Sequence, residues 1–179
     1  MKKSDIKKLP LHFDEYINLA EDEELLTALQ NSLIMEKLID ISLLEKNADY
    51  CYKPGKWSVK GVLQHIIDAE RILAYRALRF ARNDKTVLPG FDEALYGANS
   101  PLAERAINDL LEELKVVRIG TILLFKNFNE KILLRRGVCF NIEIDVLSLG
   151  FSIIGHQQHH FNVITKNYFN KRENNENNQ

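Results

Sequence analysis

The sequence predicts an all-α protein folded as one four-helix bundle. Apolar residues recur at helical spacing through four long segments, and signals for strands are scarce. The chain has 179 residues, of which 45% are apolar, so it is the size of one ordinary domain with a substantial core. We therefore expect a single domain over residues 1–170. The tail at 171–179, "KRENNENNQ", is too polar to pack and is predicted to be disordered.

Four helices are predicted in order along the chain. The first runs from about Glu23 to Glu45. The second runs from Ser58 to Arg82, with Ser58 as the N-cap at the end of "PGKWS". The third runs from Pro101 to about Phe128, because "NSP" offers Ser100 as a cap and Pro101 as the first helical residue. The fourth runs from about Ile144 to Phe169.

Two connections carry further information. The segment "NDKTVLPGFDEALYGANS" between the second and third helices is far longer than the usual two to eight residues. It is either a plain connector or a cover that brings Phe91 and Tyr96 over a site. The segment "NEKILLRRGVCFNIEI" alternates apolar and polar residues around Gly137, which indicates a short hairpin or a frayed helix end.

Composition excludes several classes of function. With 24 Lys and Arg against 25 Asp and Glu, the chain has no basic field for nucleic acid or an anionic membrane. No apolar run approaches the roughly 20 residues that span a bilayer, and the start lacks the apolar core of a signal peptide. A cytoplasmic protein is expected. Cys51 and Cys139 have no partner at a metal or redox spacing, so both are predicted to be reduced, small buried residues.

Three histidines crowd into "IIGHQQHHFNVI", and a helical wheel separates them. His160 falls about 40° from the centre of the apolar arc, His156 about 80° and His159 about 140°. His156 and His160 therefore face inward while His159 faces the polar side. Their i, i+4 spacing places the two inward rings about 6 Å apart along the axis, where both can reach one metal ion.

The second helix offers further candidates in "VLQHIIDAER". His65 lies at the edge of its apolar arc and is the candidate third ligand. Glu70 lies inside the arc and needs a partner: it orients a ligand histidine, accepts a proton as a catalytic residue, or pairs with an arginine. Arg76 is a candidate for binding an anionic substrate, with an ordinary ion pair as the alternative. His12 is expected to be a surface residue.

Three neutral imidazoles without a fourth protein ligand leave coordination positions open, which is typical of a catalytic metal site. The alternative is that His156 and His160 are core residues, each satisfied by one hydrogen bond. A zincin site is excluded, because Gln157 stands where that motif carries its glutamate base.

The segment "YKPGKWSVKGVLQHIIDAERILAYRALRFARNDKTVLPGFDE", followed about seventy residues later by "GHQQHHFNVI", resembles the DinB-like superfamily, which includes the YfiT-type proteins. The resemblance implies a four-helix bundle with the second and fourth helices side by side. It implies one divalent ion, commonly nickel or zinc, bound by His65, His156 and His160. Gly61 departs from relatives that carry glutamate there, which weakens the helix start and not the metal site.

The resemblance implies more than one activity. The leading interpretation is a metal-dependent enzyme that activates a low-molecular-weight thiol, such as bacillithiol or mycothiol, for transfer to a small electrophile. This choice follows because Gln157 cannot accept a proton, whereas a thiol with a pKa of about 8.5 needs no base once it binds the ion. The alternatives are a hydrolase that uses metal-bound hydroxide and a non-catalytic, stress-associated metal-binding bundle. A homodimer is a candidate assembly, since the non-catalytic bundle would act through dimerisation.

Overall fold

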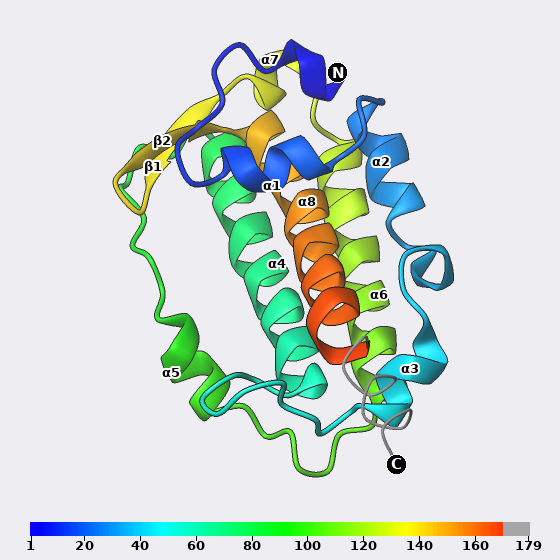
Figure 1. Ribbon diagram of the computed structural model, residues 1–179. Coiled ribbons are helices and arrows are strands. Elements are labelled where there is room, and N and C mark those ends of the chain that lie inside the picture. The colour runs from blue at the N-terminus through cyan, green and yellow to red at the C-terminus, as the bar shows by residue number, and fades with distance from the viewer. Residues whose placement is uncertain (170–179) are drawn as a thin grey trace, which may run out of the picture.

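The structure, a computed structural model, describes residues 1–169, so the predicted tail at 171–179 lies outside the described residues. Three long helices form its centre: α4 (Val59–Ala81), α6 (Ile107–Lys126) and α8 (Val146–Ile164). Helix α4 packs against both α6 and α8, which places the second and fourth predicted helices side by side (Figure 1). The all-α prediction is confirmed except for one small hairpin.

Helix α4 begins where the sequence predicts. The hydroxyl oxygen of Ser58 accepts a hydrogen bond of 3.2 Å from the backbone N–H of Gly61, which satisfies one of the free donors at the helix start. The helix ends at Ala81, one residue before the predicted end. This helix carries His65, Glu70 and Arg76 toward the interior.

The prediction of one continuous first helix over Glu23–Glu45 is wrong. The segment is divided into α2 (Leu25–Asn31), the 3-10 turn η2 (Met35–Lys37) and α3 (Ile41–Lys46). The break begins at Ser32, whose hydroxyl donates to the carbonyl oxygen of Leu29 and accepts from Arg118. No proline or glycine marks the break, so the sequence pattern did not reveal it. Helix α2 still packs against α6 and α8 in the fourth position of the bundle.

The predicted start of the third helix at Pro101 is also wrong, because α6 begins at Ile107. The hydroxyl of Ser100 donates instead to the carbonyl oxygen of Tyr96, and so closes the preceding short helix α5 (Glu93–Ala98). At the true start, the carboxylate of Asp109 accepts a hydrogen bond of 3.2 Å from the N–H of Ala106.

The predicted hairpin is present, and it shortens the fourth helix. Strands β1 (Arg136–Cys139) and β2 (Ile142–Asp145) pair antiparallel after the short helix α7 (Glu130–Leu133). Phe140 and Asn141 both have positive φ, 51° and 61°, as in a two-residue type I′ turn. Ile144 therefore lies in β2, and α8 begins at Val146 behind the N-cap Asp145. After Ile164 the helix continues as the π turn η3 (Thr165–Phe169).

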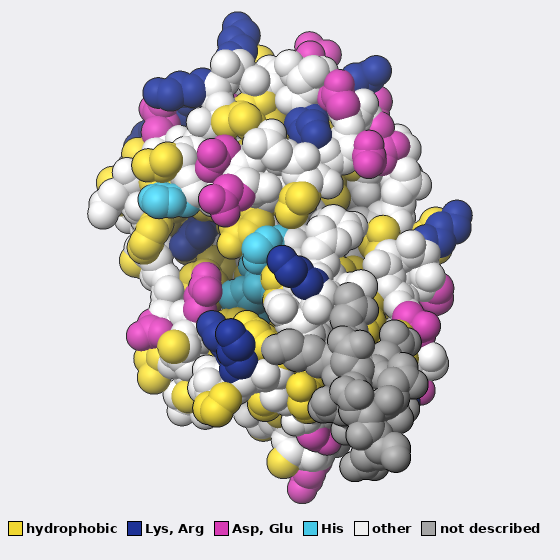
Figure 2. Space-filling model, viewed as in Figure 1, with side chains coloured by type: hydrophobic (Ala, Val, Ile, Leu, Met, Phe, Trp, Pro, Cys, Tyr) yellow, Lys and Arg dark blue, Asp and Glu magenta, His cyan; other side chains and the backbone are white. Residues whose placement is uncertain are grey.

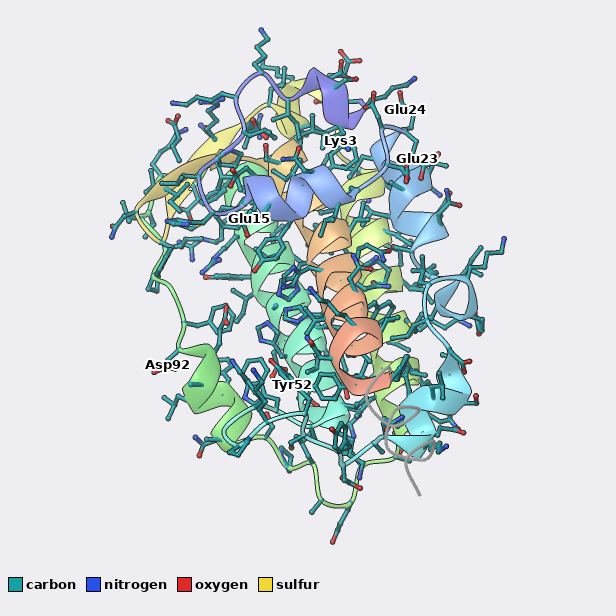
Figure 3. The ribbon with its side chains drawn as sticks, viewed as in Figure 1. Lys3, Glu15, Glu23, Glu24, Tyr52 and Asp92 are labelled. Atoms are coloured by element: carbon teal, nitrogen blue, oxygen red, sulfur yellow. The ribbon has the colours of Figure 1, made fainter. Side chains whose placement is uncertain are left out.

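A short N-terminal helix that the sequence did not predict, α1 (Asp14–Leu19), crosses α8. At the crossing, a Cβ on Gly155 would lie 1.7 Å from the carbonyl oxygen of Tyr16, so only glycine permits this approach. The segment before α1 includes the 3-10 turn η1 (Lys3–Asp5), and its first residues contact the rest of the protein (Figure 3). The Met1 ammonium lies 2.5 Å from the Glu24 carboxylate, and the Lys3 ammonium donates to a backbone carbonyl.

The interior has two apolar clusters with a polar layer between them. One cluster lies at the hairpin end and includes Leu73 of α4 and Phe125 of α6, and the other lies at the α3 end and includes Leu63 and Leu110. The buried polar residues at the middle of the long helices are Glu70, Arg118, Thr121, His156 and Gln157. The candidate site therefore lies at a level of the bundle where polar side chains interrupt the core.

The two cysteines are free, Cys139 buried as expected but Cys51 exposed against expectation. Among residues 1–169, no helix combines the length and the apolar character that crossing a membrane requires.

Candidate metal centre

The structure brings together the three histidines that the sequence singled out. His65 comes from α4, and His156 and His160 come from adjacent turns of α8. The ring nitrogens that each offers to an ion all lie within 4.8 Å of one another. His65 and His156 are 6% and 7% exposed, and His160 is half-buried.

The converging nitrogens fit a cation better than they fit hydrogen bonds. Nε2 of His156 lies 3.1 Å from Nε2 of His65 and 3.1 Å from Nε2 of His160. A neutral imidazole nitrogen carries either one proton or one lone pair, so Nε2 of His156 cannot make good hydrogen bonds to both neighbours. Neighbouring nitrogens that each lie about 2.0–2.1 Å from a shared ion are about 3 Å apart, as here. The donor set therefore fits one divalent ion.

Burial keeps the three rings in the neutral form that binds metal. It lowers the pKa of His65 to about 4, with a further contribution from His159. It lowers the pKa of His160 to about 3, and it holds the pKa of His156 well below the ordinary value. Near neutral pH each ring therefore has a lone pair available for an ion.

Aromatic rings hold the cluster from two sides. The ring of Trp57 lies 4.8 Å from that of His65, and the ring of Tyr16 lies edge-on to His156 at 5.1 Å. His159 is not part of the converging set among the described residues: its ring lies edge-on to Tyr16 at 5.3 Å. The wheel predicted that His159 faces the polar side; in the structure it lies outside the converging set but is half-buried, with its ring 5.0 Å from that of His160.

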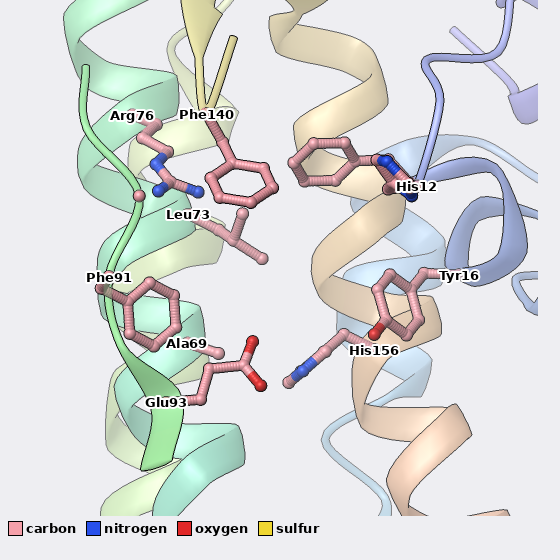
Figure 4. A pocket seen from close by; sticks show the side chains of 11 residues that line it. His12, Tyr16, Ala69, Leu73, Arg76, Phe91, Glu93, Phe140 and His156 are labelled. Atoms are coloured by element: carbon pink, nitrogen blue, oxygen red, sulfur yellow. The ribbon is translucent and has the colours of Figure 1, made fainter. Parts of the chain in front are cut away.

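A cavity of about 200 Å³ opens onto the cluster through His156. Figure 2 shows a hollow on this face of the molecule with histidine side chains inside it. Helices α4 and α8, the α1 segment, the hairpin tip and the stretch before α5 form its walls. Its lining includes the side chains of His12, Tyr16, Leu73, Arg76, Phe91, Glu93 and Phe140 (Figure 4).

Sequence reasoning missed two functional candidates in this cavity. Glu93 stands at the mouth, where partial burial and then the charge of Asp92 raise its pKa. The pKa of Tyr16 is also raised, first by burial and then by Glu93 and Glu15. Neither residue lies in a long periodic helix, so no sequence pattern pointed to them. His12 is exposed as expected, yet it also lines the cavity.

The connection that carries Glu93 is fixed to the rest of the protein. Leu88 exchanges backbone hydrogen bonds with the hairpin, donating to Val138 at 2.9 Å and accepting from Phe140 at 3.1 Å. Farther along, a Cβ on Gly97 would lie 2.6 Å from the indole of Trp57, so α5 packs closely on the ring that contacts His65. Both ends of the stretch around Glu93 are therefore held against the site.

Of the two aromatic residues expected to cover the site, Phe91 lines the cavity. Tyr96 packs against Phe91 with ring centroids 5.2 Å apart and lines a separate surface depression. Of the two residues, Phe91 is therefore the one that lines the cavity beside His156.

Glu70 has the arginine partner that was one of its three predicted roles. Its carboxylate accepts hydrogen bonds of 2.8 and 2.9 Å from Arg118 and one of 2.8 Å from the hydroxyl of Thr121. Arg118 also donates to the hydroxyl of Ser32, and the side chain of Gln157 donates to the Ser32 carbonyl at 3.1 Å. These bonds anchor α8 at the residue next to His156.

The comparisons agree with this architecture. The family model described as the DinB superfamily matches residues 13–164. Among solved structures, YfiT from Bacillus subtilis is similar, with a TM-score of 0.59, 17% sequence identity and 86% of each chain covered. That protein is described as a probable metal-dependent hydrolase with an unusual four-helix bundle topology. No curated protein sequence matches this chain.

Proposed function

We propose that this chain, which belongs to the DinB superfamily, is a metal-dependent enzyme that activates a nucleophile for attack on a small molecule. The observation that carries the proposal is the convergence of His65, His156 and His160 beside an open cavity. These three residues would hold one divalent ion, nickel or zinc in the first instance, since imidazole suits both. Such an ion supplies Lewis acidity, which lowers the pKa of water or of a thiol.

The protein groups around the cavity favour hydrolysis as the first candidate reaction. The preference for a thiol assumed that no base stands near the ion, because Gln157 cannot titrate. Glu93 lines the same cavity as His156, and its raised pKa makes its carboxylate a better proton acceptor. Glu93 would accept the proton of an attacking water, and the hydroxyl of Tyr16 would help to orient the substrate.

Thiol transfer is the second candidate, favoured by the shape of the cavity. Its volume of about 200 Å³ is below the 300–1,000 Å³ typical of ligand pockets, and it opens to the surface. A larger thiol could insert only its sulfur end, with its remainder outside. Thiol transfer does not need Glu93 as a base, whereas hydrolysis does. A substitution of Glu93 therefore distinguishes the two reactions. The remaining alternative is a non-catalytic metal-binding bundle, which predicts a bound ion and no turnover.

The test compares wild type with Glu93→Gln after loading with zinc or nickel. Aryl esters and amides are offered without thiol, and 1-chloro-2,4-dinitrobenzene is offered with a low-molecular-weight thiol. Hydrolysis predicts a loss of roughly 100-fold in kcat in Glu93→Gln with unchanged metal content. Glu104→Gln, at an exposed acid in the turn before α6, is the matched control.

Three outcomes decide between the candidates. Thiol-dependent turnover that Glu93→Gln leaves intact would promote thiol transfer. Turnover that persists in metal-free His160→Ala would contradict both metal-dependent reactions. One bound ion with no turnover of either kind would favour the non-catalytic bundle.

A further inference from the structure

Arg76 is a buried cation that has no acidic partner among the described residues. It is 5% exposed, and its guanidinium makes one hydrogen bond among the described residues, from Nη2 to the carbonyl oxygen of Pro89 at 2.9 Å. No Asp or Glu carboxylate in residues 1–169 lies within 4.0 Å of it. Arg118, the other buried arginine of the bundle, has Glu70 as its counterion. A buried charge without a counterion is costly, so the position of Arg76 needs an explanation.

The guanidinium faces the cavity described above. Figure 4 shows it reaching inward from α4 beside Phe140 and above Phe91. Nε and Nη1 have no hydrogen-bond partner in the described part of the chain, so both can donate to a molecule in the cavity. A guanidinium presents these donors in a fixed planar arrangement that matches a carboxylate.

The surroundings of Arg76 are apolar, which points to an organic anion. Leu73 is 7% exposed and lies one turn before Arg76, and the rings of Phe91 and Phe140 complete the wall. Such a wall can contact the hydrocarbon part of a larger anion, which an inorganic ion lacks. Within residues 1–169, Glu93 is the only carboxylate that lines the cavity. With a divalent ion at the histidines, the cavity would carry an excess of positive charge.

We infer that the substrate is an organic anion whose carboxylate binds Arg76 while its apolar part packs on Leu73 and Phe91. Ala69, which lines the histidine end of the cavity, precedes Arg76 by two helical turns, about 10 Å along α4. The anionic group and the reacting bond therefore occupy opposite ends of the ligand. The position of the reacting bond rests on the proposed function, whereas binding of the carboxylate to Arg76 does not.

The experiment measures binding of phenylacetate and of its uncharged match phenylacetamide to the full-length, metal-loaded protein by titration calorimetry. Wild type should bind phenylacetate roughly tenfold or more tightly than phenylacetamide, because a charged carboxylate accepts a stronger hydrogen bond from the guanidinium than a neutral amide does. Arg76→Gln should abolish this preference. Arg76→Lys, which keeps the charge and loses the planar donors, should retain part of it. Arg71→Gln, at a half-exposed arginine of the same helix, should leave it unchanged.

A second arm repeats the titration after the ion is removed with EDTA, because a carboxylate can also bind a metal. Preference for phenylacetate that survives EDTA and is lost in Arg76→Gln supports the inference even if no metal proves to be bound. Preference that is lost with EDTA and survives Arg76→Gln would place the carboxylate on the ion and overturn it. Equal affinity for the acid and the amide, or binding of inorganic phosphate as tight as that of phenylacetate, would overturn it as well. If Arg76→Gln does not fold, the preference for phenylacetate over phenylacetamide is compared between wild type and Arg76→Lys. A preference in wild type that is reduced in Arg76→Lys supports the inference.

Discussion

The carboxylate of Glu70 and the guanidinium of Arg118 form a two-bond ion pair in the centre of the bundle, with both side chains at most 2% exposed. The pair joins α4 to α6 at the level of the histidines, and the charge of Arg118 contributes to the lowered pKa of His156. Both oxygens of Glu70 are engaged by Arg118, and one also accepts from Thr121. We therefore expect Glu70 to support the site through packing and charge balance.

Replacing Glu70 with Gln should destabilise the protein strongly, because it leaves the Arg118 charge buried without a counterion. The expected loss in the free energy of unfolding is about 3–5 kcal/mol, measured by urea denaturation. The double variant Glu70→Gln/Arg118→Met should recover part of the loss, since it removes the unpaired charge. Lost turnover with normal stability and metal content would instead assign Glu70 the catalytic role considered from the sequence.

The histidines can be separated by single substitutions. His160→Ala should abolish tight binding of one divalent ion per chain, because it removes one of three converging nitrogens. His159→Ala should leave the metal content unchanged, since that ring lies outside the converging set of the described residues. Elemental analysis of both purified variants gives the answer. Equal loss of metal from both would mean that His159 is a ligand.

The metal-free protein should lose stability in mild acid. The folded-state pKa values of His65 and His160 are about 4 and about 3, below the ordinary 6.5 that these groups recover on unfolding. Between pH 6.5 and 4 the unfolded chain therefore binds more protons than the folded protein, and the free energy of unfolding falls as pH falls. Urea midpoints across this window test the slope. It should be shallower in His160→Ala, and equal slopes in both proteins would contradict the assignment.

Two glycine-to-alanine substitutions should change stability in opposite directions. Gly155→Ala places a methyl group against the backbone of Tyr16, so α1 must move, and both the melting temperature and the metal affinity should fall. Gly120→Ala, at an exposed position of α6 with no atom within 4 Å of the new methyl, should stabilise by about 0.5–1 kcal/mol. A Gly155→Ala protein as stable as wild type would show that α1 is not held at this crossing.

Periodicity predicted the parts of the fold that are regular. Helix α4 has a clear apolar face and a serine cap, and both its ends were predicted to within one residue. On α8 the same reasoning placed His156 and His160 inward, because a long helix with one buried face has a well-defined wheel. The resemblance carried by these two helices was confirmed by the family match.

Where the predicted helix boundaries were wrong, contacts between residues determine the structure, and the hydrophobic periodicity does not reveal them. The break after α2 depends on Ser32, whose hydroxyl is bound by Arg118, a residue 86 positions away. The false helix start at Ser100 arose because a serine can serve either the following helix or the preceding one, and here it bonds to Tyr96. Helix α1 and the stretch carrying Glu93 are too short to show a period, so the sequence pattern did not reveal the cavity walls, although it did single out the three histidines.

The crossing of α1 over α8 at Gly155 also bears on the order of folding. It joins residues about 140 positions apart in the chain, so its formation closes one of the longest loops in the protein. Contacts of such separation are expected to form after the local pairing of α8 with the hairpin. The three histidines of the candidate metal centre come from α4 and α8, whereas the cavity wall also includes residues of the α1 segment. Docking of α1 is therefore needed to complete the cavity and not to bring the three histidines together.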